Sequence, residues 1–426
     1  MRAPFVSGGE ARAIKVPRVA AVQDGARNHY AMPVALRRAG ILERMFTDFF
    51  VKSGSGVDRL SSLLRSMGVA KRAGDRRCKE LDTATVIQSY WLTARQRIER
   101  LRREPLDVHY ERLGLLTEEW IVNHGFRSAN ALMGFVSHIS HGLCAAARRQ
   151  GLVTVADQII APIPVLHREA AIQAERWPGW EQAEHSEGFD RLRRCEELTW
   201  DALDHITCAS DYVRRSLMEE GVPSEKVSVI HYPIDETSLA FHDRRNRTGP
   251  VVVGFIGAVG LRKGAPYFFE IARRFNPKEV RFVMVGPVHL QKWAVAKFGG
   301  HVEVIGGVPR SEVPEWARRM DIMLFPSTCE GSAFALMEAM SSGLPVVTSP
   351  NSGSLARHGQ EGFIAAYDDI DALAEYVREL ATDPERRQEI GRAARQRCEQ
   401  FNLDYYSREL SALFHRLVGA RENARP

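Results

Sequence analysis

The chain has 426 residues, of which 44% are hydrophobic and 26% are charged. This length predicts two or three domains and excludes a disordered tail or a small disulfide-stapled scaffold. The 58 basic side chains exceed the 53 acidic ones by 5, which is too small a surplus over this length to indicate a nucleic-acid-binding protein.

The six cysteines are scattered without a C-x-x-C pair, so they suggest neither a zinc site nor a disulfide framework. A reducing compartment fits this pattern best. Charged residues interrupt the N-terminal region before any apolar run is long enough for a signal peptide, and no run reaches the ~18 apolar residues of a membrane-spanning helix. We therefore expect a cytoplasmic protein that does not cross a membrane.

The first half of the chain alternates between predicted strands and helices. A strand, a short polar turn and a helix are expected over residues 18–40. The alternation resumes after residue 130, and the strands expected there lie at 152–157, 205–210 and 226–232. Strands that alternate with helices indicate parallel pairing in an open α/β sheet.

The region between about residues 52 and 104 differs in composition from its surroundings. It is strongly basic, carries helical patterns and shows few strand signals, so we interpret it as a helical insertion or a surface module. Apolar residues alternate with basic ones from Arg59 to Arg103, as in an amphipathic helix that lies on anionic lipid. An ordinary solvated helix packed on the domain explains the same pattern, so peripheral membrane contact stays an alternative.

The stretch 234–250 loses periodicity and carries charge, Gly and Pro, so we place the domain linker there. This divides the chain into a first domain over 1–240, a second domain over 241–405, and a C-terminal helix over 406–426 that we expect to pack back toward the first domain. Strands in the second half are expected at 251–257, 280–286, 301–307, 321–327 and 344–349. Two doubly wound Rossmann-like halves place a ligand in the crevice between them, outside the carboxyl ends of the strands.

The stretch FPSTCEGSAFALMEAMSSG carries the most informative chemistry. A buried strand ends near Ser327, a tight loop carries Glu330, and a helix that begins near Ser332 carries Glu338. Free N–H groups at a helix start attract anions, and carboxylates accept hydrogen bonds from the vicinal hydroxyls of a sugar or ribose. We expect both carboxylates and these amides to converge on one pocket. Taken alone, an E-x7-E spacing is better explained without a ligand, by a first glutamate that complements the helix dipole and a second one on a solvated helix face.

A glycine-rich turn, GFIGAVGLRKG, opens the second half. Strand, turn and helix place Arg262 and Lys263 at the same edge of the crevice, where paired cations can neutralise a diphosphate that gains charge as it leaves. The glycines do not form G-x-G-x-x-G, which argues against a dinucleotide site. If the segment stood alone, a flexible turn with solvated basic residues would explain it.

Together these segments resemble the retaining glycosyltransferases of group 1, family 4, which have the α/β GT-B fold. The similarity includes ASDYVRRSLMEEGVPSEKVSVIHYPID and NSGSLARHGQEGFIAAYDDIDALAEYVREL, is strong over residues 205–405 and is weak before about residue 130. It implies an enzyme that moves a sugar from a nucleotide-diphosphate donor, with retention of configuration. The first domain would be the acceptor side, and the second would bind the donor. The acceptor would be a glycan, a lipid-linked molecule or a small molecule.

The resemblance also assigns roles to individual residues. It implies that Glu330 contacts hydroxyls of the donor sugar, Glu338 contacts the ribose, and Arg262 with Lys263 binds the diphosphate. Many members have an arginine where this chain has Ala258, so either Arg262 takes over its task or the phosphate is held more weakly. The other donor-pocket positions implied are Gly257, Gly286, Val308, Gly331, Ser332, Ala333 and Phe334.

In the first domain the family commonly has a glycine-rich loop and a histidine at a strand end. The loop here reads DGARNH, with Gly25 as its single glycine, so its phosphate role is in question and Arg27 is the candidate substitute. His138, with His141 behind it, is the candidate histidine, because an imidazole can donate a hydrogen bond near neutral pH. A structural or helix-capping histidine is the alternative.

The mechanism implied by the family is substitution at the anomeric carbon without an enzymic nucleophile, so that catalysis is positioning and charge stabilisation. No Asp-x-Asp motif stands in a suitable loop, and GT-B enzymes generally need no divalent ion, so we predict no metal and no cofactor. A binding or scaffold protein that keeps the GT-B shape without catalysis is the main alternative. A GT-B epimerase or phosphorylase fits less well.

Overall fold

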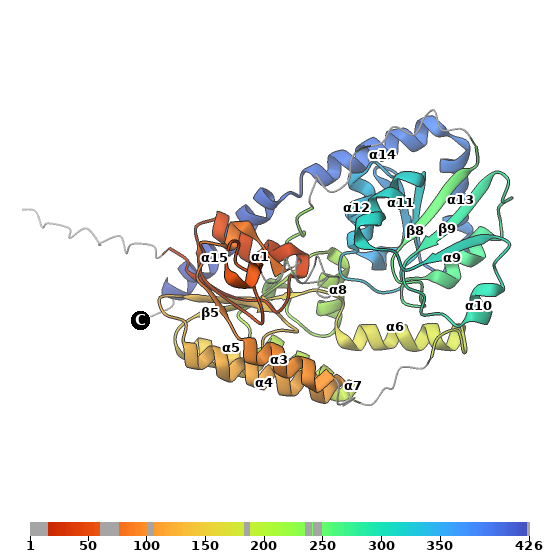
Figure 1. The fold of residues 1–426 in the computed structure, drawn as a ribbon. Helices are drawn as coiled ribbons and strands as arrows, with labels where there is room; N and C mark the ends of the chain where they lie inside the picture. The colour runs from red at the N-terminus through yellow and green to blue at the C-terminus, as the bar shows by residue number, and fades with distance from the viewer. Residues whose placement is uncertain are drawn as a thin grey trace, which may run out of the picture.

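The computed structural model describes residues 16–59, 76–100, 106–182, 188–234, 241 and 249–423. Within these residues two parallel sheets form the framework of two α/β bodies (Figure 1). The first sheet has seven strands in the order β3-β2-β1-β4-β5-β6-β7, and the second has six in the order β10-β9-β8-β11-β12-β13. Both orders reverse direction beside a central strand, which is where a doubly wound sheet opens a crevice at its carboxyl edge.

Short apolar runs form the strands of the first sheet. Its central strands are almost wholly buried, as expected where helices cover both faces of a parallel sheet. The strands are β1 Val19–Val22, β2 Leu42–Thr47, β3 Val86–Gln88, β4 Ala131–Phe135, β5 Val153–Gln158, β6 His205–Cys208 and β7 Val227–Val229.

Helices of the first body begin at side-chain caps where the sequence supplies them. Ser140 and Ser210 each accept a hydrogen bond from a backbone N–H in the first turn of the helix that follows. The helices are α1 Ala31–Arg38, α3 Tyr90–Arg100, α4 Leu106–His124, α5 His141–Arg149, α7 Phe189–Ala202 and α8 Asp211–Glu219.

The second body repeats this plan with a smaller sheet. Its strands are β8 Val251–Ile256, β9 Val280–Val285, β10 Val302–Gly306, β11 Ile322–Phe325, β12 Val346–Thr348 and β13 Gly362–Ile364. Its helices are α9 Ala265–Ala272, α10 Lys292–Ala296, α11 Val313–Arg319, α12 Phe334–Ser341, α13 Ile370–Thr382 and α14 Pro384–Glu399. None of the helices in the described residues has an eighteen-residue stretch apolar enough to span a membrane.

Two helices cross between the bodies. Helix α6, Ile163–Arg176, follows β5 of the first sheet but runs beneath the second body, whereas α15, Leu403–Asn423, follows α14 and lies beside α1 (Figure 1). Ser407 Oγ on α15 donates to the carbonyl of Ala35 at 2.8 Å, and Arg421 on α15 pairs with Asp204 at 2.9 Å. The C-terminal helix is therefore bonded to the first body by its start and its end.

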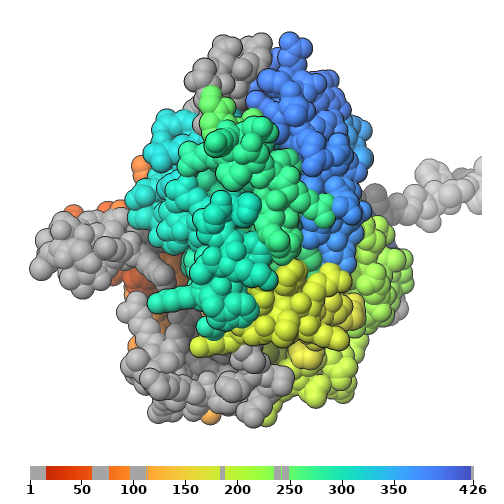
Figure 2. Space-filling model, turned by 90° about the vertical axis from the view of Figure 1, so that its right-hand side faces the viewer, coloured from red at the N-terminus to blue at the C-terminus, as the bar shows by residue number. Residues whose placement is uncertain are grey.

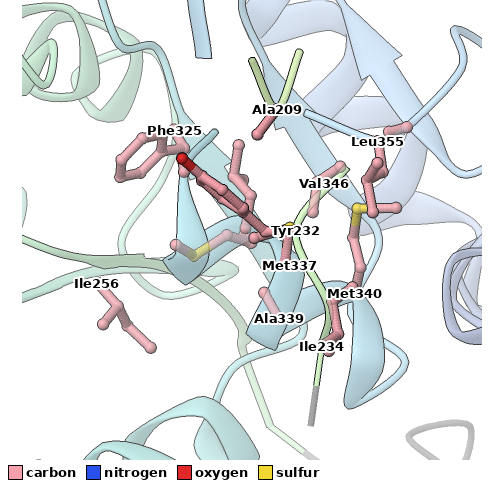
Figure 3. Packing of buried hydrophobic residues seen from close by; sticks show 14 of the residues in the cluster. Ala209, Tyr232, Ile234, Ile256, Phe325, Met337, Ala339, Met340, Val346 and Leu355 are labelled. Atoms are coloured by element: carbon pink, nitrogen blue, oxygen red, sulfur yellow. The ribbon is translucent and has the colours of Figure 1, made fainter. Parts of the chain in front are cut away.

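The apolar core is continuous across the two bodies. Tyr232 and Ile234, at the end of the first half, pack in one cluster with Met337 and Met340 of α12 and with Leu355 (Figure 3). Since burial of apolar surface is the main stabilising term, this shared core holds the two bodies together.

The predicted alternation is confirmed, with four strands that we did not predict. The sheets contain β2, β3, β4 and β13 in addition to the predicted strands. The basic region expected to be helical contains β3, which pairs in parallel with β2 as the outermost strand of the first sheet. Most of the predicted linker lies outside the described residues.

Gly264 is the position where the second body most clearly requires glycine. Its φ is +76°, and a Cβ there would lie 1.8 Å from the carbonyl oxygen of Pro326. Gly40 has a similar φ of +71° but nothing within 4 Å of a Cβ, so it is a matched control. We expect Gly40→Ala to lower the free energy of unfolding by about 1 kcal/mol, and Gly264→Ala by at least about 2 kcal/mol more. Equilibrium urea unfolding measures both, and equal effects would contradict the crowding argument.

Candidate functional site

Three charged side chains meet beside the loop between β11 and α12. Glu330 belongs to this loop, whereas Arg262 and Lys263 come from the turn after β8. Arg262 Nη1 and Lys263 Nζ each donate to Glu330 Oε1 at 2.7 Å, and Ser327 Oγ donates to the same oxygen at 3.3 Å. All three bonds go to Oε1, so no described residue uses Oε2. Glu330 is buried, with 7% of its surface exposed, while the Arg262 side chain is 44% exposed. The cluster therefore carries one net positive charge and reaches solvent on its arginine side.

The turn after β8 is tied to this loop through the backbone. Thr328 N donates to the carbonyl of Arg262 at 2.9 Å, and Ser327 Oγ donates to the same oxygen at 3.1 Å. Lys263 lies with its ammonium 5.0 Å from the centre of the Phe325 ring, and its stem passes the space that a Cβ at Gly257 would need. Burial lowers the pKa of Lys263, and the Glu330 carboxylate counteracts that shift.

The same loop is in contact with the first body. Ser210 Oγ donates to the carbonyl of Gly331, and Ala161 N donates to the carbonyl of Glu330 at 3.4 Å. A Cβ at Gly331 would lie 1.7 Å from the carbonyl oxygen of Ile159, so only glycine allows the two backbones to approach this closely. Glu330 is thus held at the boundary between the two bodies.

The backbone amides before α12 are only partly available. Glu330 N donates to Asn351 O at 3.0 Å and Ala333 N donates to Ser352 O at 3.1 Å, so the expectation of a whole row of free amides is wrong. These two amides are satisfied because the loop after β12 folds over them. The amides of Gly331, Ser332 and Phe334 donate to no residue in the described part of the chain.

Glu338 belongs to a second ion pair. It lies on α12 and bonds to Arg310, which follows β10, rather than to Glu330, Arg262 or Lys263. The sequence analysis did not single out Arg310, although its place after a strand end was a usable signal. Glu330, in the loop before α12, and Glu338, within that helix, therefore pair with different cations.

The remaining predicted donor-side positions lie at the carboxyl edge of the second sheet. Gly257 N donates to Val285 O, and Gly286 N donates to Gly306 O, both at 2.9 Å. A Cβ at Gly286 would lie 1.8 Å from Gly257 O, so the loops after β8 and β9 pack backbone to backbone. Val308 follows β10 at the same edge and is half-buried.

In the first body, the amide of Gly25 is already occupied. It donates to Asp48 Oδ1 at 2.8 Å, and the same oxygen accepts from Arg76 at 2.8 Å. Burial raises the pKa of the neighbouring Asp24 to about 7, and the Asp48 carboxylate adds to that shift. The Gly25 amide is therefore engaged by Asp48 rather than free, and that carboxylate is paired with Arg76.

His138 lies beside this loop. Asp24 N donates to His138 Nδ1 at 3.4 Å, so the proton of the neutral imidazole lies on Nε2. Burial, together with the nearby Arg27 guanidinium, lowers the pKa of His138 to about 4. Among the described residues, His138 makes no hydrogen bond with Glu330, Arg262 or Lys263. His141, predicted to lie behind it, is exposed at the start of α5.

A buried contact that the sequence analysis missed connects the two bodies. The Tyr232 hydroxyl donates to Asp157 Oδ1, and Thr207 Oγ1 donates to Asp157 Oδ2 at 2.9 Å. The Tyr232 ring stacks on Phe334, with 5.7 Å between ring centres and 11° between planes. Burial raises the pKa of Asp157 to about 6. An aspartate near the end of one strand and a tyrosine shortly after another were the available signal.

Much of the basic region lies outside the described residues. Of the arginines that it contains, Arg76 pairs with Asp48 and Arg77 pairs with Asp58. These two guanidinium groups therefore serve contacts within the first body rather than a lipid surface. Within the residues that the structure describes, no three His, Cys, Asp or Glu side chains are grouped so that they could hold a metal ion.

Comparisons with known proteins agree with this geometry. Residues 239–397 match the family model of glycosyl transferases group 1. This match covers most of the second body. Glycogen synthase of Mycobacterium tuberculosis is 28% identical over 55% of this chain and 58% of its own length, and the amylovoran biosynthesis glycosyltransferase AmsK of Erwinia amylovora is 28% identical over 55% and 60%. The chain thus spans about three fifths of the length of these relatives.

Solved structures extend the likeness to the first body. Anabaena HepE in complex with UDP and glucose has a TM-score of 0.58 at 13% identity and covers 93% of this chain and 99% of its own. Sucrose-phosphate synthase of Thermosynechococcus elongatus has a TM-score of 0.62 at 15% identity and covers 95% and 100%. The predicted GT-B fold is therefore confirmed.

The pKa of His138 gives a testable pH dependence. The unfolded chain protonates this residue near its ordinary value of 6.5, whereas the folded protein does so only near 4, so the free energy of unfolding falls as pH falls. Between about pH 7.5 and about pH 5, His138 should lower the free energy of unfolding of the wild type by about 2 kcal/mol. The His138→Gln variant should lack this part of the fall. Urea unfolding of both proteins across this range measures the difference, in which the shared contributions of Asp24 and Asp157 cancel. Parallel curves would contradict the assignment.

Proposed function

We propose that the protein is a glycosyltransferase that moves a sugar from a nucleoside-diphosphate sugar to a hydroxyl group of an acceptor, with retention of configuration at the anomeric carbon. The observation that carries this proposal is the convergence of Arg262 and Lys263 on the single buried carboxylate of Glu330. Two cations against one carboxylate leave positive charge for a diphosphate, and the carboxylate is an acceptor for sugar hydroxyls.

Donor binding at this cluster would exchange partners. The diphosphate oxygens take the guanidinium and the ammonium, which are the stronger partners for a doubly charged group, and Glu330 then turns its oxygens to the sugar. Oε2, which no described residue uses, is available before that exchange. The charge that develops on the leaving diphosphate is met by Arg262 and Lys263, without a metal ion.

The neighbouring groups complete the proposed donor pocket. The amides of Gly331, Ser332 and Phe334 lie at the positive end of the α12 dipole and can donate to a phosphate or a sugar oxygen. Glu338 would accept from the ribose hydroxyls, which requires it to release Arg310. A neutral His138, with its proton on Nε2, can donate to a hydroxyl of the donor sugar from the first body.

The reaction itself would take place on one face of the sugar. The acceptor oxygen forms a bond to the anomeric carbon while the bond from that carbon to the diphosphate oxygen breaks, and the electron pair stays on the diphosphate. The acceptor proton passes to the leaving diphosphate oxygen. The names of the relatives support this class of reaction, because HepE was solved with UDP and glucose, and glycogen synthase and AmsK are named for carbohydrate synthesis.

Removing the central charges should abolish turnover without unfolding the protein. We expect Glu330→Gln and Lys263→Ala each to lower kcat/KM by about 100-fold or more, because each removes an interaction that strengthens as the diphosphate leaves. Transfer from a nucleotide sugar, followed by release of the nucleoside diphosphate, measures this. Glu303→Gln and Lys278→Ala are the matched controls, since both side chains are exposed on the second body. Near-normal activity in both site variants would overturn the proposal.

The donor base can be identified by binding. We expect one of UDP-, GDP-, ADP- and dTDP-sugars to raise the thermal unfolding midpoint by several degrees, because a ligand that binds only the folded state stabilises it. Lys263→Ala should lose most of that rise because the diphosphate contact is gone. If no nucleotide sugar shifts the midpoint of the wild type, the proposed donor class is wrong.

A non-catalytic nucleotide-sugar-binding protein is the second candidate. Occupation of the Gly25 amide by Asp48 favours it, because this loop then lends no amide to a diphosphate. The two candidates differ in one measurement. A binding protein would give the thermal shift but neither transfer to an acceptor nor hydrolysis of the donor.

A further inference from the structure

The segment from Ile159 to Glu181 comes from the first half of the chain but lies against the second body. Helix α6 makes up most of it, and Figure 2 shows it, in yellow, pressed against the green and teal surface of the second body. Tyr267 of α9 donates to Gln173 at 2.6 Å and accepts from Arg176 at 3.1 Å. The segment is therefore a fixed part of the second body rather than a loose connection.

Its two ends touch the two motifs of the candidate site. At the first end, the carbonyl of Ile159 lies against Gly331, and Ala161 N bonds to the carbonyl of Glu330. At the other end, Glu181 Oε1 accepts a hydrogen bond of 2.7 Å from Leu261 N, in the turn that carries Arg262 and Lys263. One continuous stretch of chain thus bridges the carboxylate loop and the basic turn.

Trp180 anchors the second end. It is 5% exposed, and its ring lies 5.8 Å from Phe298 and 6.4 Å from Phe269, measured between ring centres. Its carbonyl accepts from Gln291 N at 2.7 Å. Because Trp180 is packed and bonded, the next residue along the chain presents its carboxylate to the turn from a fixed position.

Leu261 needs the acceptor that Glu181 supplies. Leu261 is buried, with 8% of its surface exposed, and among the described residues Glu181 is the partner of its amide. A buried N–H without an acceptor is costly, so the turn would shift to find one. A shift at Leu261 moves the next two residues, which are the two cations on Glu330.

We propose that Glu181 is a positioning residue for the diphosphate-binding cations, supplied to the second body by the first half of the chain. It contacts neither substrate nor reacting atoms. Its carboxylate holds the amide of Leu261 so that Arg262 and Lys263 face Glu330 and, on binding, the diphosphate of the donor. This inference rests on the proposed function for its ligand, but the hydrogen bond that it concerns exists without one.

The test compares Glu181→Ala and Glu181→Gln with Glu175→Ala in the full-length protein. Glu175 is exposed on α6 and is the matched control. Hydrogen exchange of peptides covering residues 257–264 is measured without ligand, and the affinity for UDP, GDP, ADP and dTDP is measured by calorimetry. We expect Glu181→Ala to speed exchange of the turn and to weaken the nucleotide that binds by about tenfold, with little change in the unfolding midpoint. Gln keeps an acceptor oxygen, so it should restore most of the affinity, and Glu175→Ala should match the wild type.

Each other outcome overturns the inference in a recognisable way. Unchanged exchange in Glu181→Ala means that the carboxylate does not hold the turn. Faster exchange of the turn with unchanged nucleotide affinity means that the role of Glu181 is structural only. If Glu181→Gln binds the nucleotide as weakly as Glu181→Ala, the loss of a hydrogen-bond acceptor is not the cause of the weaker binding. If the wild type binds none of the four nucleotides, the proposed function fails and this inference fails with it, whatever the exchange data show.

Discussion

The site depends on one carboxylate oxygen shared by two cations. Glu330 Oε1 satisfies both Arg262 and Lys263 in a buried position, and that arrangement is stable only because the surrounding loops leave neither partner unpaired. The cluster has more positive than negative charge, so it is better suited to an arriving polyanion than to its own carboxylate alone. A site of this kind is ordered before the ligand arrives, which reduces the reorganisation needed during binding.

Neither half of the chain makes this arrangement alone. The second body supplies all three charges, but the first half supplies the contacts that hold their loops, through Ser210 and Ile159 at Gly331 and through Glu181 at the basic turn. Tyr232 adds an aromatic contact at the start of α12 while its hydroxyl bonds to a buried aspartate of the first sheet. The first body therefore has a structural role in the proposed donor site as well as its expected role toward the acceptor.

The parts of this site that follow from local sequence were predictable. Strand ends, the glycine-rich turn and the Glu330 loop are each specified by a few consecutive residues, so their meeting at one sheet edge follows from the α/β pattern. The path of α6 was not predictable, because it depends on where Trp180 finds a pocket more than 80 residues later in the chain. Arg310 beside Glu338 and Asp48 beside Gly25 were missed for the same reason, since each pairing joins elements that are not consecutive in the chain. Strands β2, β3 and β13 lacked the continuous apolar runs that marked the predicted strands.

These contacts restrict how the two bodies can move relative to each other. Opening the crevice must either separate Gly331 from Ile159 and Ser210 or carry the start of α6 along with the second body. If the start of α6 moves with the second body, the buried ring contacts of Trp180 and the bond of Glu181 to the turn are kept. Otherwise both would be lost together. Loss of well-packed apolar contacts costs more than bending a few backbone bonds at the ends of a helix, so α6 should move with the second body. In that case the basic turn keeps its bond to Glu181 and Gly331 stays against Ile159, and the bond from Ser210 to Gly331 is the one that breaks when the bodies separate.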